Sequence, residues 1–552
     1  MRERGVSWLS ASVPPTRTLA TLFSFLALFL CHGGGAAFAC TNVIGVGVTV
    51  TSCLYSTVKN GQAADALVTN EGYVLVSLSG PAGVQVFQPV DGGYRNPCGG
   101  QNIIVFPATV AGPVQQVMGM SLFPSLQHDR HEGRVPIPID PQVSVGAAVE
   151  SQGAEFFHLS RLDTCTLDGV VNVQQPQPRN ANSKAPGTFD LAVTPDGSYA
   201  FVANEYGNVS NVPLDWTGTV GIIRTPRDEL GRFTTETRAL LQNNSTYYIY
   251  VEGANALPGV TVSRDGRFLY VVHEAAIPPY ENPTNSSNPI LVTGKTCLQR
   301  ESDPAAYNGL LTVIDVFKAI AGYGQNSILR TIASACSPTR VVETQDGRYI
   351  WVAARGSNKV LAFDVWKLLF SPNDALVGHG DSGGTAPVGL ALFNNDGLLA
   401  VANSNRFTDG TRGTTNVAIL DVRNFSGVAV KATIDSENIY SFPRGVTLGP
   451  DGTTLYVANF GCVKDPQTSC KKDWPGRLQV ITTMRGDFRD TRPPEERGGR
   501  VTDRGGGLAP PDRATDSSSG DSRVRGIDKS FGAAQAGNTG SSGRPATRPT
   551  LP

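Results

Sequence analysis

The chain has 552 residues and a formal net charge of −1, from 46 basic and 47 acidic residues. This balance provides no global basic field, so we expect no nucleic-acid partner. With 61 glycines and 37 prolines the sequence is rich in turns, which is typical of a fold built from many short strands.

Residues 1–39 have the pattern of a signal peptide. Arg2, Arg4 and Arg17 precede or flank an apolar run at residues 19–30, and small residues follow, ending in Ala37-Phe38-Ala39. The run is shorter than the roughly twenty residues of a membrane-spanning helix. We therefore expect a secreted or extracellular protein, which could be associated with the cell surface or cell wall. An uncleaved anchor and a lipid-modified Cys40 are the alternatives, and we expect no membrane span in the mature chain.

Of the nine cysteines, eight follow the predicted signal peptide. An even number after an export signal favours disulfides. The spacings suggest two local pairs, Cys40 with Cys53 and Cys462 with Cys470, and leave the other pairings open; buried free thiols are the alternative. No CxxC pair occurs and histidine is scarce, so we expect no metal site and no cofactor. His128 and His131 lie in a polar insertion that we interpret as a surface loop.

A repeat occupies most of the remaining chain. An apolar strand, a turn of the Asp-Gly type, a second apolar strand, a variable loop and a third strand recur in that order. Asp-Gly between apolar runs indicates a hairpin, and the continuous apolarity indicates strands buried on both faces. Seven copies begin near residues 66, 119, 189, 259, 339, 388 and 444, and the second copy carries a long insertion in place of its turn.

Seven such units predict an all-β fold, a seven-bladed β-propeller of four-stranded antiparallel blades at residues 40–485. The array must close to protect its end strands. We expect residues 43–50 (VIGVGVTV) to add an outer strand to the last blade, next to residues 478–482. Residues 486–552 mix charges with Gly and Ser and contain few apolar residues. We predict a disordered tail there, without a GPI anchor.

Several strand ends resemble YVTN-type propeller repeats. They are FVANEYG from Phe201, WVAARGSNKVLAFDV from Trp351, AVANSN from Ala400 and YVANFG from Tyr456. The resemblance covers about residues 66–482, and its superfamily includes seven-bladed lactonases related to 6-phosphogluconolactonase. It implies the fold and a lactonase-like activity, although no catalytic motif of that family can be placed on this sequence. The Gly-His and Trp-Asp signatures of WD40 propellers are missing.

Propellers place ligands at an end of the central channel, so polar residues at equivalent repeat positions are the candidates. Asn can also cap turns, and Arg and Glu can pair without binding anything. As catalytic residues we single out His273, Glu274 and Arg355, which could polarise a lactone carbonyl for attack by water. The candidate ligand-binding residues are Asp190, Glu205, Arg340, Asn403, Arg406, Arg444 and Asn459.

Three functions remain open. The first is an extracellular or surface binding or scaffold protein that uses the loops at the channel end, suggested by large, unequal loops without a catalytic constellation. The second is a lactonase-like hydrolase that opens a cyclic ester at the channel. The third is a quinoprotein-like redox propeller, although the five tryptophans are not in register. The expected partner is a glycan, a peptide or a small lactone or anion, and we expect a monomer.

Five Asn-x-Ser/Thr triplets are compatible with a glycosylated secretory protein. They begin at Asn208, Asn243, Asn244, Asn285 and Asn424.

Overall fold

The structure is a computed structural model. It describes residues 37–46, 48–57, 61–79, 82–98, 103–104, 116–124, 142–150, 153–174, 187–205, 217–242, 245–246, 248–276, 308–405, 415–436, 441–461 and 474–483. Most of the predicted signal peptide, the predicted tail, the insertion with His128 and His131, and the predicted Cys462–Cys470 pair lie outside these ranges.

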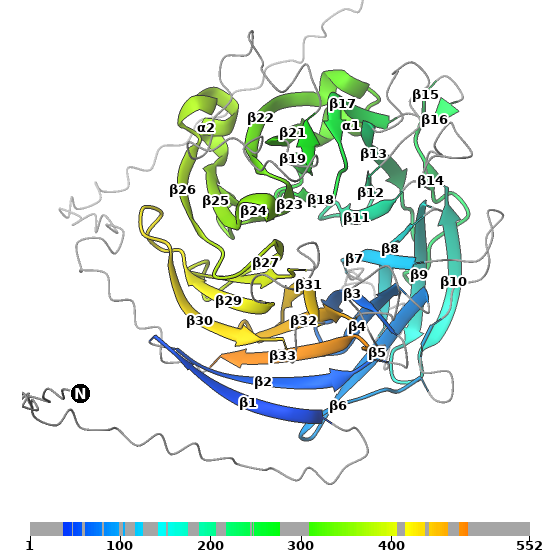
Figure 1. Ribbon diagram of the computed structural model, residues 1–552. Helices are drawn as coiled ribbons and strands as arrows, with labels where there is room; N and C mark the ends of the chain where they lie inside the picture. Colours follow the sequence, from blue (N-terminus) through cyan, green and yellow to red (C-terminus); the bar gives the residue numbers. More distant parts are fainter. Residues whose placement is uncertain are drawn as a thin grey trace, which may run out of the picture. The chain divides into compact units, whose positions relative to one another are not determined.

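Apart from one two-stranded hairpin, the described strands form seven antiparallel sheets arranged around a centre, as the sequence repeat predicts (Figure 1). Each sheet is one blade, and the first strand of each blade is innermost. The inner strands neighbour one another in chain order, and that of blade 7 returns to that of blade 1, which closes the ring. The fold is therefore a seven-bladed β-propeller.

The first three blades correspond to the first three predicted copies of the repeat. Their strands are given in order from the channel outward. Blade 1 contains β3 (Ala63–Val68), β4 (Val74–Ser79), β5 (Ala82–Val90) and β6 (Gly93–Arg95). Blade 2 contains β7 (Gln116–Leu122), β8 (Val143–Glu150), β9 (Gly153–Arg161) and β10 (Thr166–Val173). Blade 3 contains β11 (Thr188–Val193), β12 (Tyr199–Asn204), β13 (Thr217–Arg224) and β17 (Tyr248–Asn255), with short additions at β14 (Arg238–Ala239) and β20 (Ala275–Ala276), and is followed by a hairpin of β15 (Leu241–Gln242) and β16 (Ser245–Thr246).

The last four blades continue the pattern. Blade 4 contains β18 (Gly259–Val262), β19 (Phe268–His273), β21 (Asn308–Asp315) and β22 (Ile328–Cys336). Blade 5 contains β23 (Pro338–Glu343), β24 (Tyr349–Ala354), β25 (Lys359–Asp364) and β26 (Leu376–Asp381). Blade 6 contains β27 (Pro387–Phe393), β28 (Leu398–Asn403), β29 (Asn416–Asp421) and β30 (Ala429–Asp435). Blade 7 contains β31 (Phe442–Leu448), β32 (Thr454–Phe460), β33 (Arg477–Thr483), β2 (Val48–Ser56) and β1 (Ala37–Gly45).

The Asp-Gly turns join the first and second strands of a blade. In blade 3, Gly197 has a φ of +70°, which glycine adopts without a steric penalty. The Asp196 carboxylate accepts hydrogen bonds from the Thr194 hydroxyl and from the Ser198 N–H. Such side-chain bonds to nearby backbone are the reason that Asp favours turns.

The N-terminal segment closes the ring, as predicted, but with two strands rather than one. Residues 43–50 are divided between β1 and β2, because the chain turns back between them. It is β2 that pairs with β33, with Cys53 opposite Val480. The predicted Cys40–Cys53 disulfide joins β1 to β2. β1 begins at Ala37, so cleavage after Ala39 would leave residues 40–45 of this strand in the mature protein.

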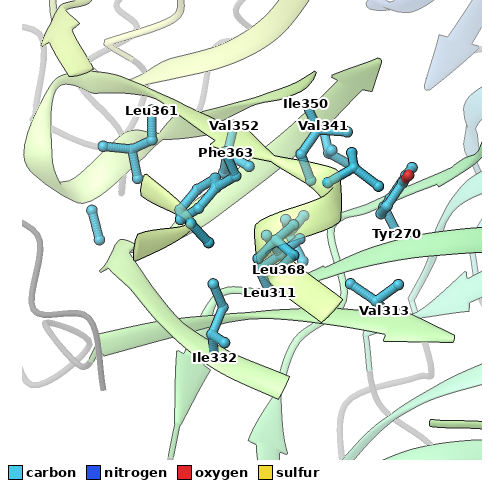
Figure 2. Packing of buried hydrophobic residues seen from close by; sticks show 14 of the residues in the cluster. Tyr270, Leu311, Val313, Ile332, Val341, Ile350, Val352, Leu361, Phe363 and Leu368 are labelled. Atoms are coloured by element: carbon cyan, nitrogen blue, oxygen red, sulfur yellow. The ribbon is translucent and has the colours of Figure 1, made fainter. Parts of the chain in front are cut away.

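The core lies between adjacent blades. At the interface of blades 4 and 5, Leu311 and Ile332 pack with Val352 and Phe363, and all four are buried (Figure 2). Leu368 joins them from α2 (Val365–Phe370), a short helix between β25 and β26. Because one blade cannot cover its own apolar faces, this packing explains the nearly continuous apolarity of the strands.

Two short helices occupy equivalent places, between the third and fourth strands of their blades. α1 (Val316–Ile320) follows β21, and its N-cap Asp315 accepts from the Lys318 N–H; Asp364 caps α2 in the same way. Short 3₁₀ turns lie at η3 (Gly324–Ser327), η4 (Arg355–Ser357) and η5 (Pro372–Asp374). No helix in the described ranges has the length and apolarity needed to cross a membrane.

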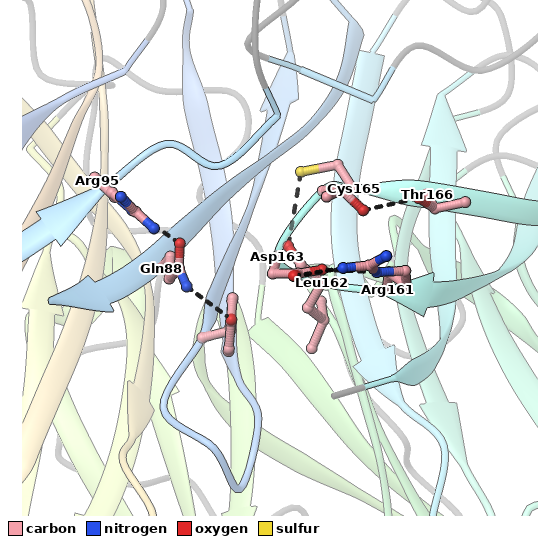
Figure 3. Close-up of polar contacts among 9 residues, drawn as sticks. Gln88, Arg95, Arg161, Leu162, Asp163, Cys165 and Thr166 are labelled. Carbon is pink, nitrogen blue, oxygen red and sulfur yellow. Dashed lines mark hydrogen bonds and ion pairs between the residues drawn. The ribbon is translucent and has the colours of Figure 1, made fainter. Parts of the chain in front are cut away.

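Polar contacts and a second disulfide hold the outer parts of blades 1 and 2. Cys98 and Cys165 are bonded, a long-range pairing that the sequence left open. Nearby, the Arg95 side chain donates to Gln88 Oε1 at 2.9 Å, and Arg161 pairs with Asp163 at 2.9 Å (Figure 3). Disulfides are typical of proteins that mature in an oxidising compartment.

Candidate functional site

A cavity of about 290 Å³ occupies the central channel. Its lining comes from the inner strands of all seven blades, which converge there because each blade directs its first strand to the axis. Asp190 and Arg340, two of the predicted ligand-binding residues, both line it. The volume is near the lower limit of typical small-molecule pockets.

Asp190 and Arg340 form an ion pair across the channel, joining blades 3 and 5. The Asp190 carboxylate also accepts the N–H of Val260 in blade 4 at 3.0 Å. In blade 1 the Asp65 carboxylate accepts the N–H of Met120 in blade 2 at 3.0 Å. The two aspartates therefore bind their neighbouring blades, and Arg340 lies in the field of both.

Burial dominates the electrostatics of this triad of Asp65, Asp190 and Arg340. Burial raises the pKa of Asp65 to about 6, although the Arg340 guanidinium opposes the shift. Burial also disfavours the charged form of Arg340 and so lowers its pKa. The carboxylates of Asp190 and Asp65 together have a larger, opposite effect, so the pKa of Arg340 is raised above its usual value. The guanidinium is thus paired by carboxylates of the protein itself.

The inner strands approach one another closely beside these carboxylates. A Cβ atom at Gly119 would lie 2.5 Å from Asp190 Oδ1, and one at Gly445 would contact Asp65 Oδ1. Glycine at these two positions lets the aspartates reach the adjacent blade.

A second group of charged residues lies just before the start of the inner strands, and we call it the strand-end cluster. It consists of Glu205, Glu274 and Arg355, each directly after the second strand of blades 3, 4 and 5. Their backbone N–H groups donate to Gly187, Ala256 and Ser337, respectively, which precede the inner strands of the same blades. The three residues thus occupy one repeated position in successive blades.

The structure brings two predicted catalytic residues of the cluster into contact. Glu274 and Arg355 form an ion pair, and each side chain is 18% exposed. Burial lowers the pKa of Arg355 to about 10, with the Glu205 carboxylate acting in the opposite direction. Successive blades therefore place two carboxylates and one guanidinium close together at a partly open position.

Three other predicted residues lie one position before the strand-end cluster position of their repeats, and their side chains are buried inside the blades. They are His273, Asn403 and Asn459. His273 Nε2 is 3.0 Å from Thr312 Oγ1, and burial lowers the pKa of His273 to about 3. Asn403 donates to Asn416 Oδ1 at 2.9 Å, and Asn459 donates to Gln479 Oε1 at 3.1 Å. These side chains form hydrogen bonds within their own blades. A contact between them and a ligand stays a prediction.

The last two predicted residues are arginines, of which the structure describes one. The Arg444 guanidinium carbon is 5.3 Å from the centroid of the Phe460 ring, a cation–π arrangement. Arg406 lies outside the described residues.

Asp65 is the channel residue that the candidate set missed. It stands seven residues before the turn glycine Gly72, the same interval that separates Asp190 from Gly197 and Arg340 from Gly347. Counting back from the turn glycines would have identified it. Among the described residues, no group of three or more His, Cys, Asp and Glu is placed to hold a metal ion.

Comparisons with known proteins assign no family. No protein-family model and no curated protein matches the sequence. The β-propeller domain of Cps50 (Swd1) from Myceliophteria thermophila is similar over 78% of this chain and 100% of that domain, at 9% identity and a TM-score of 0.44. A chain from the mitotic checkpoint complex is similar over 87% of this chain and 98% of its own, at 10% identity and a TM-score of 0.43. Hydrazine synthase from Kuenenia stuttgartiensis covers 57% of this chain and 70% of its own, at 18% identity and a TM-score of 0.35.

These values are too low to carry an argument about activity or partners. The YVTN-type and lactonase resemblance accordingly stays a prediction from the sequence.

Proposed function

We propose that the chain is an extracellular binding or scaffold protein that contacts its partner through the end of the ring where the second strands finish. The observation that carries the proposal is the strand-end cluster, in which Glu205, Glu274 and Arg355 come from three successive blades. Charged side chains on a rigid scaffold at one end of a channel suit recognition of a polar partner.

Preorganisation supports this choice of surface. The backbone of each cluster residue is tied to its own blade, and the Glu274–Arg355 ion pair further restricts two long side chains. Binding therefore needs little additional ordering of this surface. The central cavity is a weaker candidate, because the guanidinium of Arg340 is already paired with Asp190.

The extracellular setting rests on the disulfides. Cys40–Cys53 and Cys98–Cys165 each join different strands or loops of the folded ring. Together with the signal-like residues 1–39, they favour an oxidising compartment.

The lactonase-like alternative has one supporting observation, the contact between Glu274 and Arg355. In that interpretation Glu274 would act as the general base and Arg355 would polarise the carbonyl. His273 would not take part directly, because its ring is 2% exposed and binds Thr312 within the blade.

One experiment separates the two functions. The purified protein is applied to glycan and peptide arrays and, in parallel, to a panel of lactones with continuous detection of ring opening. The proposal expects a selective array ligand whose binding is weakened by Arg355→Ala, and no lactone turnover above buffer. Turnover that Glu274→Gln abolishes would establish the hydrolase instead.

Arg348→Ala is the matched control. Arg348 has a 64% exposed side chain, and it lies beside the turn between the first two strands, at the opposite end of blade 5 from Arg355. Equal loss of binding in both variants would mean that overall charge, and not the strand-end cluster, determines the interaction.

A further inference from the structure

The Asn-x-Ser triplet at Asn424 lies in the described part of the chain, in the loop between β29 and β30. Asn424 and Ser426 are exposed, whereas Phe425 between them is half-buried. The N–H of Gly427 donates to the Asn424 carbonyl at 3.1 Å and closes a tight turn within this loop.

The turn fixes the orientation of the Asn424 carboxamide. Its Oδ1 accepts two hydrogen bonds, from the Ser426 hydroxyl at 2.8 Å and from the Ser426 N–H at 3.1 Å. A Cβ atom at residue 427 would lie only 3.2 Å from Nδ2, so the glycine leaves space around this nitrogen. The amide oxygen is therefore held by the loop while the nitrogen has room for a substituent.

Phe425 anchors the triplet to the ring. Its ring centroid is 4.6 Å from that of Tyr349 and 5.8 Å from that of Trp351, both in blade 5. The loop thus belongs to the junction of blades 5 and 6, and the two polar residues of the triplet face outward from a fixed base.

We propose that Asn424 is a site of N-linked glycosylation. The donor class is a lipid-linked oligosaccharyl diphosphate. Nδ2 attacks the anomeric carbon of the first sugar, the bond from that carbon to the diphosphate oxygen breaks, and an N–C bond forms. The amide nitrogen releases one proton and the lipid diphosphate leaves, so no oxidant or reductant is needed. The inference relies on the predicted export and is independent of the proposed partner site.

The β29–β30 loop is at the end of blade 6 where a glycan would not block the proposed binding end. Loops between third and fourth strands lie at the same end of a blade as the Asp-Gly turns, opposite the strand-end cluster. A glycan there leaves the proposed binding end open. It would also stand beside β30, the outer strand of blade 6, where Val430 is 41% exposed.

The test is expression of the full chain in a eukaryotic cell line, followed by glycopeptide mass spectrometry of the secreted protein. We expect the peptide containing Asn424 to carry a hexosamine-linked glycan, and peptide N-glycosidase to convert Asn424 to Asp. Asn424→Gln and Ser426→Ala should each remove this glycopeptide, whereas Ser426→Thr should retain it because threonine also supplies the hydroxyl. Asn285→Gln serves as the control and should leave the Asn424 glycopeptide unchanged.

A second version, with the signal of another secreted protein in place of residues 1–39, separates export from modification. Glycosylation of Asn424 in either version supports the site. Secreted protein with unmodified Asn424 overturns the proposal, and so does failure of both versions to give any glycosylated chain.

Discussion

Arg340 in blade 5 donates a hydrogen bond to Asp190 in blade 3, and blade 4 lies between them in the ring. The same Asp190 carboxylate binds the Val260 N–H of blade 4, so one side chain connects three blades. Asp65 likewise bonds blade 1 to the Met120 N–H of blade 2, so charged groups in the channel join blades 1 and 2 in one set and blades 3, 4 and 5 in another. The centre of this propeller thus contains one ion pair and hydrogen bonds from backbone N–H groups to buried carboxylates, while its blade interfaces are apolar.

Removing Arg340 should strongly destabilise the ring. Arg340→Ala leaves Asp190 and Asp65 without their buried counter-charge, which typically costs about 3–5 kcal/mol. Thermal and denaturant unfolding, followed by circular dichroism, measure the loss. Arg348→Ala, an exposed control, should change stability by about 0.5 kcal/mol or less. A loss below about 1 kcal/mol for Arg340→Ala would show that the triad does not hold the ring.

Asp65 should make stability fall as the pH rises from about 4 to above 6. Its pKa is about 6 in the fold against an ordinary 3.8, so the folded state binds the proton more tightly than the unfolded state. The stabilising contribution of Asp65 is complete below pH 4 and is lost as the pH passes 6, with a limit of about 3 kcal/mol.

The Asp65→Asn variant removes this titration. The difference in unfolding free energy between wild type and variant should therefore change across pH 4–7. Taking the difference cancels the contribution of Glu155, whose pKa burial raises to about 7 and which acts in the same direction. If the difference in unfolding free energy between wild type and Asp65→Asn did not change with pH, the raised pKa of Asp65 would be refuted.

His273 should have the opposite effect on pH dependence. Its pKa of about 3 lies below the usual 6.5, so its contribution is present above pH 6.5 and declines as the pH falls toward 3. His273→Asn should flatten acid unfolding in this range. At pH 7.5 the variant should stay within about 1.5 kcal/mol of wild type, because Asn204, Asn403 and Asn459 fill the equivalent place in other blades.

The partner assay distinguishes a structural His273 from a functional one. Array binding should be unchanged in His273→Asn. Loss of binding or turnover in a stably folded variant would assign His273 a direct role.

The two described disulfides should differ in their contribution to stability. The chain-entropy model gives about 3 kcal/mol for Cys40–Cys53, which spans 13 residues, and more than about 4 kcal/mol for Cys98–Cys165, which spans 67. Paired Cys→Ser variants at each bond, compared by denaturant unfolding, measure both values. The reverse order would mean that ring closure through β1 and β2 matters more than loop length.

The sequence was sufficient for the fold because each blade contains its own local signal. The interval from the inner strand to the turn glycine is the same in most repeats, and Gly197 and its equivalents mark the hairpins. The two-stranded closure was less predictable, since residues 43–50 read as one continuous apolar strand and the turn between β1 and β2 has no Asp-Gly signal. The Cys98–Cys165 bond depends on the contact of two blades, which no local pattern encodes.

The candidate site residues differ in how their positions follow from the sequence. The structure places Glu205, Glu274 and Arg355 at one equivalent position, because the same backbone geometry recurs in successive blades, and their role as a site stays a prediction. The side chain of His273, one residue earlier, lies inside its blade, and alternation along the strand explains this difference. Arg340 and Asp190 were recognised as channel residues, but their pairing across the channel depends on the closed ring and on glycines such as Gly119.

The most direct test of the proposed binding function is the affinity of Arg355→Ala for the selected array ligand, measured beside wild type and Arg348→Ala by calorimetry. If the strand-end cluster is the partner site, Arg355→Ala should bind at least about tenfold more weakly, a loss of about 1.4 kcal/mol, while Arg348→Ala binds like wild type. Unchanged affinity in a folded Arg355→Ala protein would contradict the account and move the partner site elsewhere on the propeller.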